Sequence, residues 1–167
     1  LFPVFTKKLI EDYFTSYKLS KEDSLKTQQY KQNALRTKSQ TSFTDFDEYL
    51  RSLDIKVGIE TLNNLNIARL AQLTQKTNQF NLTTYRYTET DLISIIENNG
   101  MIFGMRVEDR FGDYGLTGLI IIKLIENDAE IDSFLLSCRI LGKDIESFFL
   151  ERVLIKLKEL EINNVYA

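Results

Sequence analysis

Two apolar runs joined by a short glycine-containing segment constrain the fold most strongly. The runs cover residues 101–107 and 116–125, and residues 110–115 between them are Arg-Phe-Gly-Asp-Tyr-Gly. Runs of this length that are rich in Ile, Leu and Val and flank a glycine-containing turn are typical of a β-hairpin. We therefore expect an antiparallel sheet at the centre of the chain.

Hydrophobic periodicity assigns the other elements around this hairpin. Helical spacing predicts helices over residues 9–17, about 21–38, 65–80, 88–98 and 143–160, and alternation predicts strands over residues 55–59, 130–137 and 164–166. Capping signals at residues 20–23 and 44–47 mark two helix starts in the first part. The order of elements predicts an α/β (α+β) fold, with a mixed, mostly antiparallel sheet flanked by helices and one late crossover helix.

The positions of glycine suggest a division of the chain. The first of the seven glycines is Gly58, and the residues before it are mostly polar and helical in pattern. We therefore predict a helical N-terminal arm or linker over residues 1–53 and a domain over residues 54–167. A folded chain of this mass buries about 70% of its extended surface, so its core needs no disulfide or structural metal.

The amino-acid composition excludes several classes of protein. The chain has no histidine and one cysteine, Cys138, which excludes Ser-His-Asp and Cys-His pairs, the usual zinc ligand sets and an internal disulfide. The net charge is −3 without a strongly basic segment, which argues against nucleic acid. No window approaches the roughly 18 apolar residues of a membrane span, and no signal-peptide pattern is present. We expect a cytoplasmic domain with no metal and no membrane partner.

The segment after the predicted strand at 130–137 is the most specific candidate for chemistry. Residues 137–142 are Ser-Cys-Arg-Ile-Leu-Gly and precede a predicted helix. A helix N-terminus and a neighbouring cation such as Arg139 both favour a thiolate, so Cys138 could act as a nucleophile. The alternative is that Cys138 is a small buried hydrophobic residue, which is common for free cysteine.

A polar cluster covers residues 72–84, which are Gln-Leu-Thr-Gln-Lys-Thr-Asn-Gln-Phe-Asn-Leu-Thr-Thr. Four of its side chains share one predicted helix face: Gln72, Gln75, Lys76 and Gln79. Buried amides require hydrogen-bond partners, so this face is either solvated or part of a shared polar site.

Charged residues surround the predicted hairpin: Arg106, Asp109, Arg110 and Asp113. They could form a paired surface network. Alternatively, Arg110 and Arg86 could clamp an anion, because guanidinium groups bind carboxylates and phosphates in bidentate fashion.

These segments together resemble the C-terminal part of FkbH-like proteins, over nearly the whole chain. The similarity rests on residues 72–84, 86–87, 109–113, 115–116 and 135–142 with Glu146, and upstream on residues 19–23, Tyr30 and Arg36. The resemblance implies a GNAT-like (acyl-CoA N-acyltransferase-like) fold in a bacterial protein. It also implies a partner domain, a haloacid-dehalogenase-type phosphatase of subfamily IIIC with its Mg²⁺, outside these residues, since they contain no phosphatase aspartate motif.

The resemblance implies transfer of a glyceryl unit from 1,3-bisphosphoglycerate to an acyl carrier protein in polyketide-type biosynthesis. Cys138 would carry the acyl group as a thioester. Binding of the substrate or of carrier-borne phosphopantetheine would involve Gln75, Asn78, Arg86, Asp109, Arg110, Arg139 and Gly142. The implied partners are the acyl carrier protein and the phosphatase domain, and no cofactor would be bound covalently.

The GNAT-like fold also implies a coenzyme A pyrophosphate motif, Arg/Gln-x-x-Gly-x-Gly/Ala, at a helix N-terminus. Arg139 and Gly142 match its first half, whereas Asp144 stands where a small residue is expected. This carboxylate argues against free acyl-CoA. Three functions remain open: glyceryl transfer through Cys138, a non-catalytic docking module for the carrier protein and the phosphatase domain, and an acyl-CoA N-acyltransferase.

Overall fold

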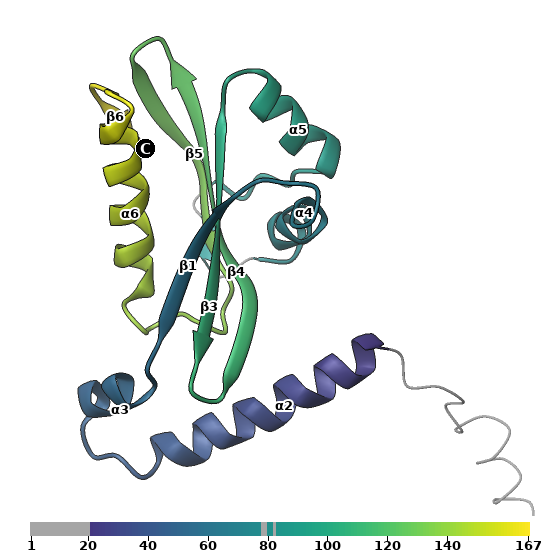
Figure 1. Cartoon of the computed structure of the whole chain (residues 1–167), viewed down its shortest axis with the longest axis vertical. Coiled ribbons are helices and arrows are strands. Elements are labelled where there is room, and N and C mark those ends of the chain that lie inside the picture. The colour runs from purple at the N-terminus through teal and green to yellow at the C-terminus, as the bar shows by residue number, and fades with distance from the viewer. Residues whose placement is uncertain (1–20, 78–79, 82) are drawn as a thin grey trace, which may run out of the picture. The chain divides into compact units, whose positions relative to one another are not determined.

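The computed structural model describes residues 21–77, 80–81 and 83–167 (Figure 1). The chain divides into two compact units, Leu1–Thr44 and Asp45–Ala167. The described part of the first unit contains helix α2 (Lys21–Gln40), as predicted. The helix predicted over residues 9–17 lies outside the described residues.

The second unit is built on a six-stranded sheet. Its elements are α3 (Phe46–Ser52), β1 (Lys56–Thr61), α4 (Ile67–Lys76), β2 (Phe80–Asn81), α5 (Glu89–Glu97), β3 (Met101–Asp109), β4 (Gly112–Ile125), β5 (Asp128–Leu136), α6 (Ile145–Glu159) and β6 (Val165–Tyr166). The order is β1-β3-β4-β5-β2, and β6 also pairs with β5. The β5–β6 pair, joined through α6, is parallel and the other pairs are antiparallel. The predicted mostly antiparallel sheet with one crossover helix is confirmed.

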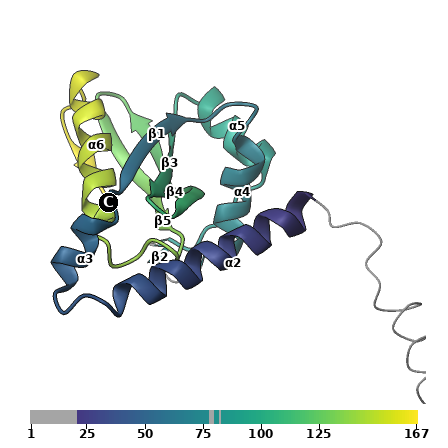
Figure 2. The same ribbon diagram turned by 60° about the horizontal axis from the view of Figure 1, so that its bottom comes forward.

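Helices cover both faces of this sheet. In Figures 1 and 2, α6 lies on one face and α4 and α5 lie on the other. Alternation along β4 supplies both layers, because Ile120 and Ile122 pack in the cluster with α6, whereas Leu119 and Ile121 pack with α4 and α5. All four side chains are fully buried. Burial of one such side chain stabilises the fold by about 1.5–3 kcal/mol.

The second unit begins at Asp45, whereas the sequence predicts an arm extending to residue 53. Asp45 caps α3 by accepting a hydrogen bond from the Asp47 amide. Tyr49 and Leu53 are then buried, and the backbone of Leu53 accepts a hydrogen bond from the Arg110 amide. Because α3 is short and polar in composition, its sequence alone does not show that Tyr49 and the adjacent Leu53 are buried.

Helix α4 ends earlier than predicted. Leu70, Leu73 and Thr77 are buried as expected, but the backbone of Thr77 is extended and ends the helix after Lys76. Phe80, predicted at the end of this helix, instead lies in β2, which pairs with the end of β5.

Helix α6 buries the predicted apolar residues with one exception. Ile145, Phe149, Val153 and Leu157 are buried, whereas Leu160 is 48% exposed. Leu160 is the C-cap residue of α6, so it has left the face that packs on the sheet.

Candidate functional site

A pocket of about 420 Å³ opens beyond the end of β5. One wall is formed by a face of α4 and the residue after it, and the other wall is formed by the first residues of the loop after β5. The lining residues are Arg69, Leu73, Lys76, Thr77, Ser137, Cys138 and Arg139. The Ser137 amide donates a hydrogen bond to the Thr117 carbonyl (2.7 Å), which anchors the start of this loop on β4.

Cys138 is exposed in this pocket. The alternative that Cys138 is a buried core residue is therefore wrong. Arg139 Nε donates a hydrogen bond to Ser137 Oγ (3.2 Å), so both neighbours of the cysteine are held together. Residues 139–144 separate Cys138 from the first residue of α6 along the chain. The cations that line the pocket together with Cys138 are Arg69, Lys76 and Arg139.

Arg69 is the functional candidate that the sequence analysis missed. Its half-buried side chain donates a hydrogen bond from Nη2 to the Leu116 carbonyl (3.3 Å) and another to the Gln72 side chain. Burial, together with the positive charge of Arg139, lowers the pKa of Arg69. Arg69 precedes Lys76 by two helical turns, so helical spacing along α4 could have identified the pair.

Gln75 and Arg86 meet at the C-terminal end of α4. Arg86 Nη1 donates hydrogen bonds to the carbonyls of Thr74 (2.6 Å) and Gln75 (2.5 Å). Gln75 Nε2 donates to the Tyr87 carbonyl (3.1 Å). These side chains close the end of the helix and do not line the pocket. Asn78 lies outside the described residues.

Asp109 shapes the turn between β3 and β4. Its side chain is 8% exposed. Oδ1 accepts hydrogen bonds from the amides of Phe111 (2.9 Å) and Gly112 (3.1 Å), and Oδ2 accepts one from the Tyr114 hydroxyl (2.8 Å). The carboxylate thus accepts hydrogen bonds from two backbone amides and one hydroxyl of the hairpin.

The same hairpin contacts the loop before α6. The Lys143 ammonium lies 5.4 Å from the centre of the Tyr114 ring, and the Arg110 guanidinium lies 4.7 Å from that of Phe111. Arg110 lies at the hairpin turn and Arg86 at the end of α4, and neither lines the pocket. Asp109 can therefore influence the loop through Tyr114 and Lys143.

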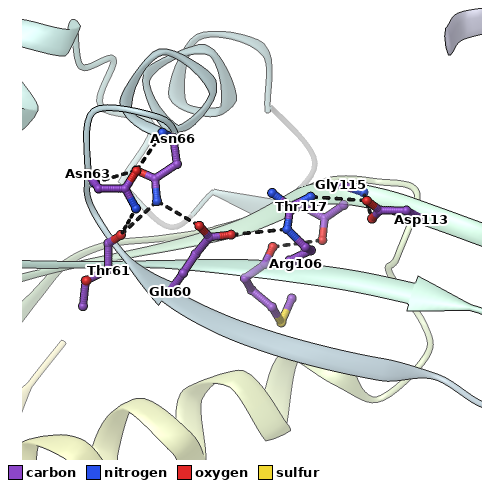
Figure 3. A network of polar contacts seen from close by, with 9 residues as sticks. Glu60, Thr61, Asn63, Asn66, Arg106, Asp113, Gly115 and Thr117 are labelled. Carbon is purple, nitrogen blue, oxygen red and sulfur yellow. Dashed lines mark hydrogen bonds and ion pairs between the residues drawn. The ribbon is translucent and has the colours of Figure 1, made fainter.

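Arg106 belongs to a separate polar network, shown in Figure 3. Its Nε lies 3.4 Å from Glu60 Oε1, and its Nη1 lies 3.3 Å from Asp113 Oδ2. Glu60 also accepts a hydrogen bond from Asn66 at the start of α4. This network joins β1, β3 and β4, and its partly exposed ion pairs each contribute little to stability.

The loop between β5 and α6 has two residues with positive φ angles, Gly142 (74°) and Asp144 (58°). A Cβ atom at Gly142 would meet no atom within 4 Å, so the backbone angle, and not crowding at Cβ, explains the glycine. Asp144 is the N-cap residue of α6, yet its carboxylate makes no capping hydrogen bond. The amides at the start of α6 are therefore not occupied by the Asp144 side chain.

Two kinds of site are absent from residues 21–77, 80–81 and 83–167. These residues contain no group of three or more His, Cys, Asp or Glu side chains that could hold a metal ion. None of their helices is both long and apolar enough to cross a bilayer.

This arrangement of strands and helices is the fold of the GNAT acetyltransferases, which confirms the predicted fold. Among solved structures, the ribosomal-protein-S18-alanine N-acetyltransferase of Escherichia coli has a TM-score of 0.52 at 10% identity, covering 66% of this chain and 64% of that one. The PaiA N-acetyltransferase of Thermoplasma acidophilum, in complex with coenzyme A, has a TM-score of 0.51 at 21% identity, covering 64% and 75%. A domain from Methanocaldococcus jannaschii has a TM-score of 0.51 at 14% identity, covering 67% of this chain and 76% of that one.

The present chain spans 64% of the length of the Escherichia coli protein. No protein-family model matches the chain, and a search of curated proteins finds no match either. At identities of 10–21% these structures establish the fold alone. The resemblance to FkbH-like proteins stays a prediction.

Proposed function

We propose that this chain is the acyltransferase domain of an FkbH-like protein, which transfers a glyceryl or related acyl unit from 1,3-bisphosphoglycerate to an acyl carrier protein. The observation that carries the proposal is an exposed thiol, Cys138, in a cationic pocket of a GNAT-type fold. The partners would be the carrier protein and a phosphatase domain that holds Mg²⁺, in the cytoplasm.

The proposed reaction has two steps at one sulfur atom. The Cys138 thiolate attacks the carbonyl carbon of the acyl phosphate, the carbon–oxygen bond to phosphate breaks, and inorganic phosphate leaves as the carbon–sulfur bond forms. The carrier's thiol then attacks this thioester and releases Cys138. The phosphate on C3 of the acyl group would be hydrolysed by the phosphatase domain, so that a glyceryl unit remains on the carrier. Exchange between thioesters is nearly isoenergetic, so the second step needs no strong base and tolerates the lack of histidine.

The surrounding residues would have distinct roles in these steps. Arg139 lies beside the thiol and would bind a phosphate of the donor. The loop around Gly142 would accept the phosphodiester of carrier-borne phosphopantetheine, which the fold shared with a coenzyme A complex supports. Gln75 and Arg86, at the C-terminal end of α4, would hold the hydroxyl groups or phosphate of the glycerate together with Asn78.

The hairpin residues would act at a distance from the sulfur. Asp109 would position the loop through Tyr114 and Lys143, consistent with its hydrogen bond to the Tyr114 hydroxyl. Arg110, at the turn, would contact the carrier or its phosphopantetheine.

The proposal is tested by trapping the acyl group. The full chain is incubated with 1,3-bisphosphoglycerate, generated continuously from 3-phosphoglycerate and ATP by phosphoglycerate kinase, and its intact mass is measured. We expect the mass of one phosphoglyceryl group on wild type, removal of that group by hydroxylamine or by a phosphopantetheinylated carrier protein, and no adduct on Cys138→Ser. An adduct that persists in Cys138→Ser would overturn the proposal. Carrier binding with no adduct on any variant would favour the docking module.

An acyl-CoA N-acyltransferase is the second candidate, favoured by the fold and by the uncapped amides at the start of α6. It predicts that acetyl-CoA raises the Tm, because a ligand at 100 times its Kd adds about 2.7 kcal/mol. The Asp144 carboxylate opposes this binding. Asp144→Gly should therefore increase the acetyl-CoA shift, with Asp144→Asn as a control that removes only the charge.

A further inference from the structure

The pocket beside Cys138 concentrates positive charge from two distant parts of the sequence. Arg69 and Lys76 come from α4, and Arg139 comes from the loop after β5. Among the residues that the structure describes, the lining of this pocket includes no carboxylate. Like charges in a confined site repel one another, so the site gains most from a ligand of opposite charge.

The neutral residues of the pocket also suit an anion with several oxygens. The Arg69 guanidinium already contacts two neutral oxygens, those of Leu116 and Gln72, and neither cancels its charge. Ser137 accepts its hydrogen bond from Arg139, which leaves the Ser137 hydroxyl proton to donate. Guanidinium groups bind two oxygens of one phosphate at once, and an ammonium group adds a point charge.

We infer that Arg69, Lys76 and Arg139 form a phosphate-binding cluster that selects acyl donors whose acyl group itself carries a phosphate. The cluster and Cys138 share one pocket of about 420 Å³, so a small acyl donor can place its phosphate on the cluster and its carbonyl at the sulfur. This inference rests on the proposed function and deepens it by adding Arg69 and Lys76 of α4. Burial and the positive charge of Arg139 both lower the pKa of Arg69. A bound anion would offset this repulsion between the two guanidinium groups.

Binding is tested first with inorganic phosphate alone. We expect phosphate to raise the Tm of the full chain relative to chloride at the same ionic strength. Arg69→Gln and Lys76→Gln should each weaken phosphate binding about tenfold or more, the scale of a hydrogen bond to a charged group. Arg51→Gln removes an equal charge from an exposed site in α3 and should leave the shift unchanged. Equal shifts in all four proteins, or none in wild type, would overturn the inference.

The thiol supplies a readout that does not depend on stability. Iodoacetate is anionic and iodoacetamide is neutral, so the ratio of their reaction rates with Cys138, relative to free cysteine, reports the local charge. We expect a higher ratio in wild type and in Arg51→Gln than in Arg69→Gln or Lys76→Gln. Phosphate should lower the wild-type ratio. A ratio that is the same in every protein would contradict the cluster.

The source of the bound phosphate is distinguished by the two half-reactions. If the cluster binds the donor, Arg69→Gln slows acylation of Cys138 by 1,3-bisphosphoglycerate but not by acetyl phosphate, which has no second phosphate. Slower discharge to the carrier with normal loading would assign the cluster to phosphopantetheine and overturn the donor assignment. Phosphate binding without any acylation of Cys138 would refute the proposed function and leave the anion site standing.

Discussion

Asp132 is a buried carboxylate on β5, only 4% exposed, with partners from three directions. It forms an ion pair with Lys123 and accepts hydrogen bonds from the hydroxyls of Tyr87 (2.5 Å) and Ser133 (3.0 Å). Burial alone would raise the pKa of Asp132, but these hydrogen bonds outweigh it and hold the pKa below its ordinary value. Burial and the bond to Asp132 raise the pKa of Tyr87.

These shifts predict how stability depends on pH. Because the pKa of Asp132 is lower in the folded state, its contribution is complete above the ordinary value of 3.8 and is lost as the pH falls through the folded-state pKa. Asp132→Asn should reduce the free energy of unfolding by about 1–3 kcal/mol at pH 7 and make the loss on acidification smaller. Urea denaturation at pH 7 and near pH 3 measures both effects.

Tyr87→Phe serves as the control for this prediction. It removes one hydrogen bond, costs about 1 kcal/mol and leaves Asp132 paired with Lys123, so most of the acid sensitivity should remain. If Asp132→Asn unfolds in acid as steeply as wild type does, another carboxylate is responsible.

The distance along the chain decides which residues could be found from the sequence. Cys138 and Arg139 are adjacent, so their strand-to-loop position was visible, and the structure puts both in one pocket. Arg69 reaches them only through packing of α4 beside the end of β5. The same holds for Tyr87 and Asp132, which belong to no local pattern and meet because β5 passes the segment before α5.

At the scale of elements, α5 is fixed by local signals. Thr88 Oγ1 accepts a hydrogen bond from the Asp91 amide (3.2 Å), and Asp91 Oδ2 accepts one from the Thr88 amide (2.7 Å). This capping box begins the helix, and Asn98 ends it. Both ends agree with the helix predicted over residues 88–98, because the signals that define them lie within the segment.

Removal of this cap should weaken the second unit. We expect Thr88→Ala to reduce the free energy of unfolding by about 1 kcal/mol, the usual cost of losing a threonine N-cap. Thr90→Ala lies exposed in the same first turn and should be neutral or slightly stabilising, since alanine favours helix. Chemical denaturation of both variants measures the difference, and equal losses would show that the cap contributes nothing.

The end of α4 shows the opposite case. Apolar spacing extends to Phe80, so the sequence alone favours a longer helix. Arg86 instead satisfies the last-turn carbonyls from beyond the helix, and Phe80 pairs with Leu136 of β5 and stacks edge-on against Phe134. Contacts with distant segments thus end the helix before the apolar spacing does. Hydrophobic periodicity within residues 65–80 cannot reveal these contacts.

At the scale of the whole molecule, the boundary between the two units determines what can fold alone. Tyr49 and Leu53 are buried and belong with residues 45–167. We expect residues 45–167 to unfold cooperatively with a Tm close to that of the full chain. Residues 54–167 should be much less stable, because truncation of even one buried leucine costs about 2–5 kcal/mol.

Thermal unfolding of the two truncated chains compares these boundaries directly. Leu53→Ala in the full chain is a milder version of the same change and should lower the Tm. Identical melting of residues 45–167 and 54–167 would show that α3 contributes no stability to the second unit. Composition predicts a boundary after residue 53 because the residues before it are mostly polar, and the burial of Tyr49 and Leu53 is not visible in that composition.

The backbone angle at Gly142 has a consequence for how this loop can evolve. A Cβ atom at this position would meet no atom within 4 Å, so a clash at that atom would not decide the outcome of a screen of all substitutions. The screen would rank them by tolerance of a left-handed backbone, keeping glycine and then asparagine or aspartate, and rejecting valine and isoleucine. Single-nucleotide changes reach valine from every glycine codon, aspartate from GGU and GGC alone, and asparagine from none. From GGU or GGC, the most accessible tolerated replacement would therefore add a second carboxylate to a loop that already carries Asp144, which makes position 142 costly to change for reasons unrelated to packing.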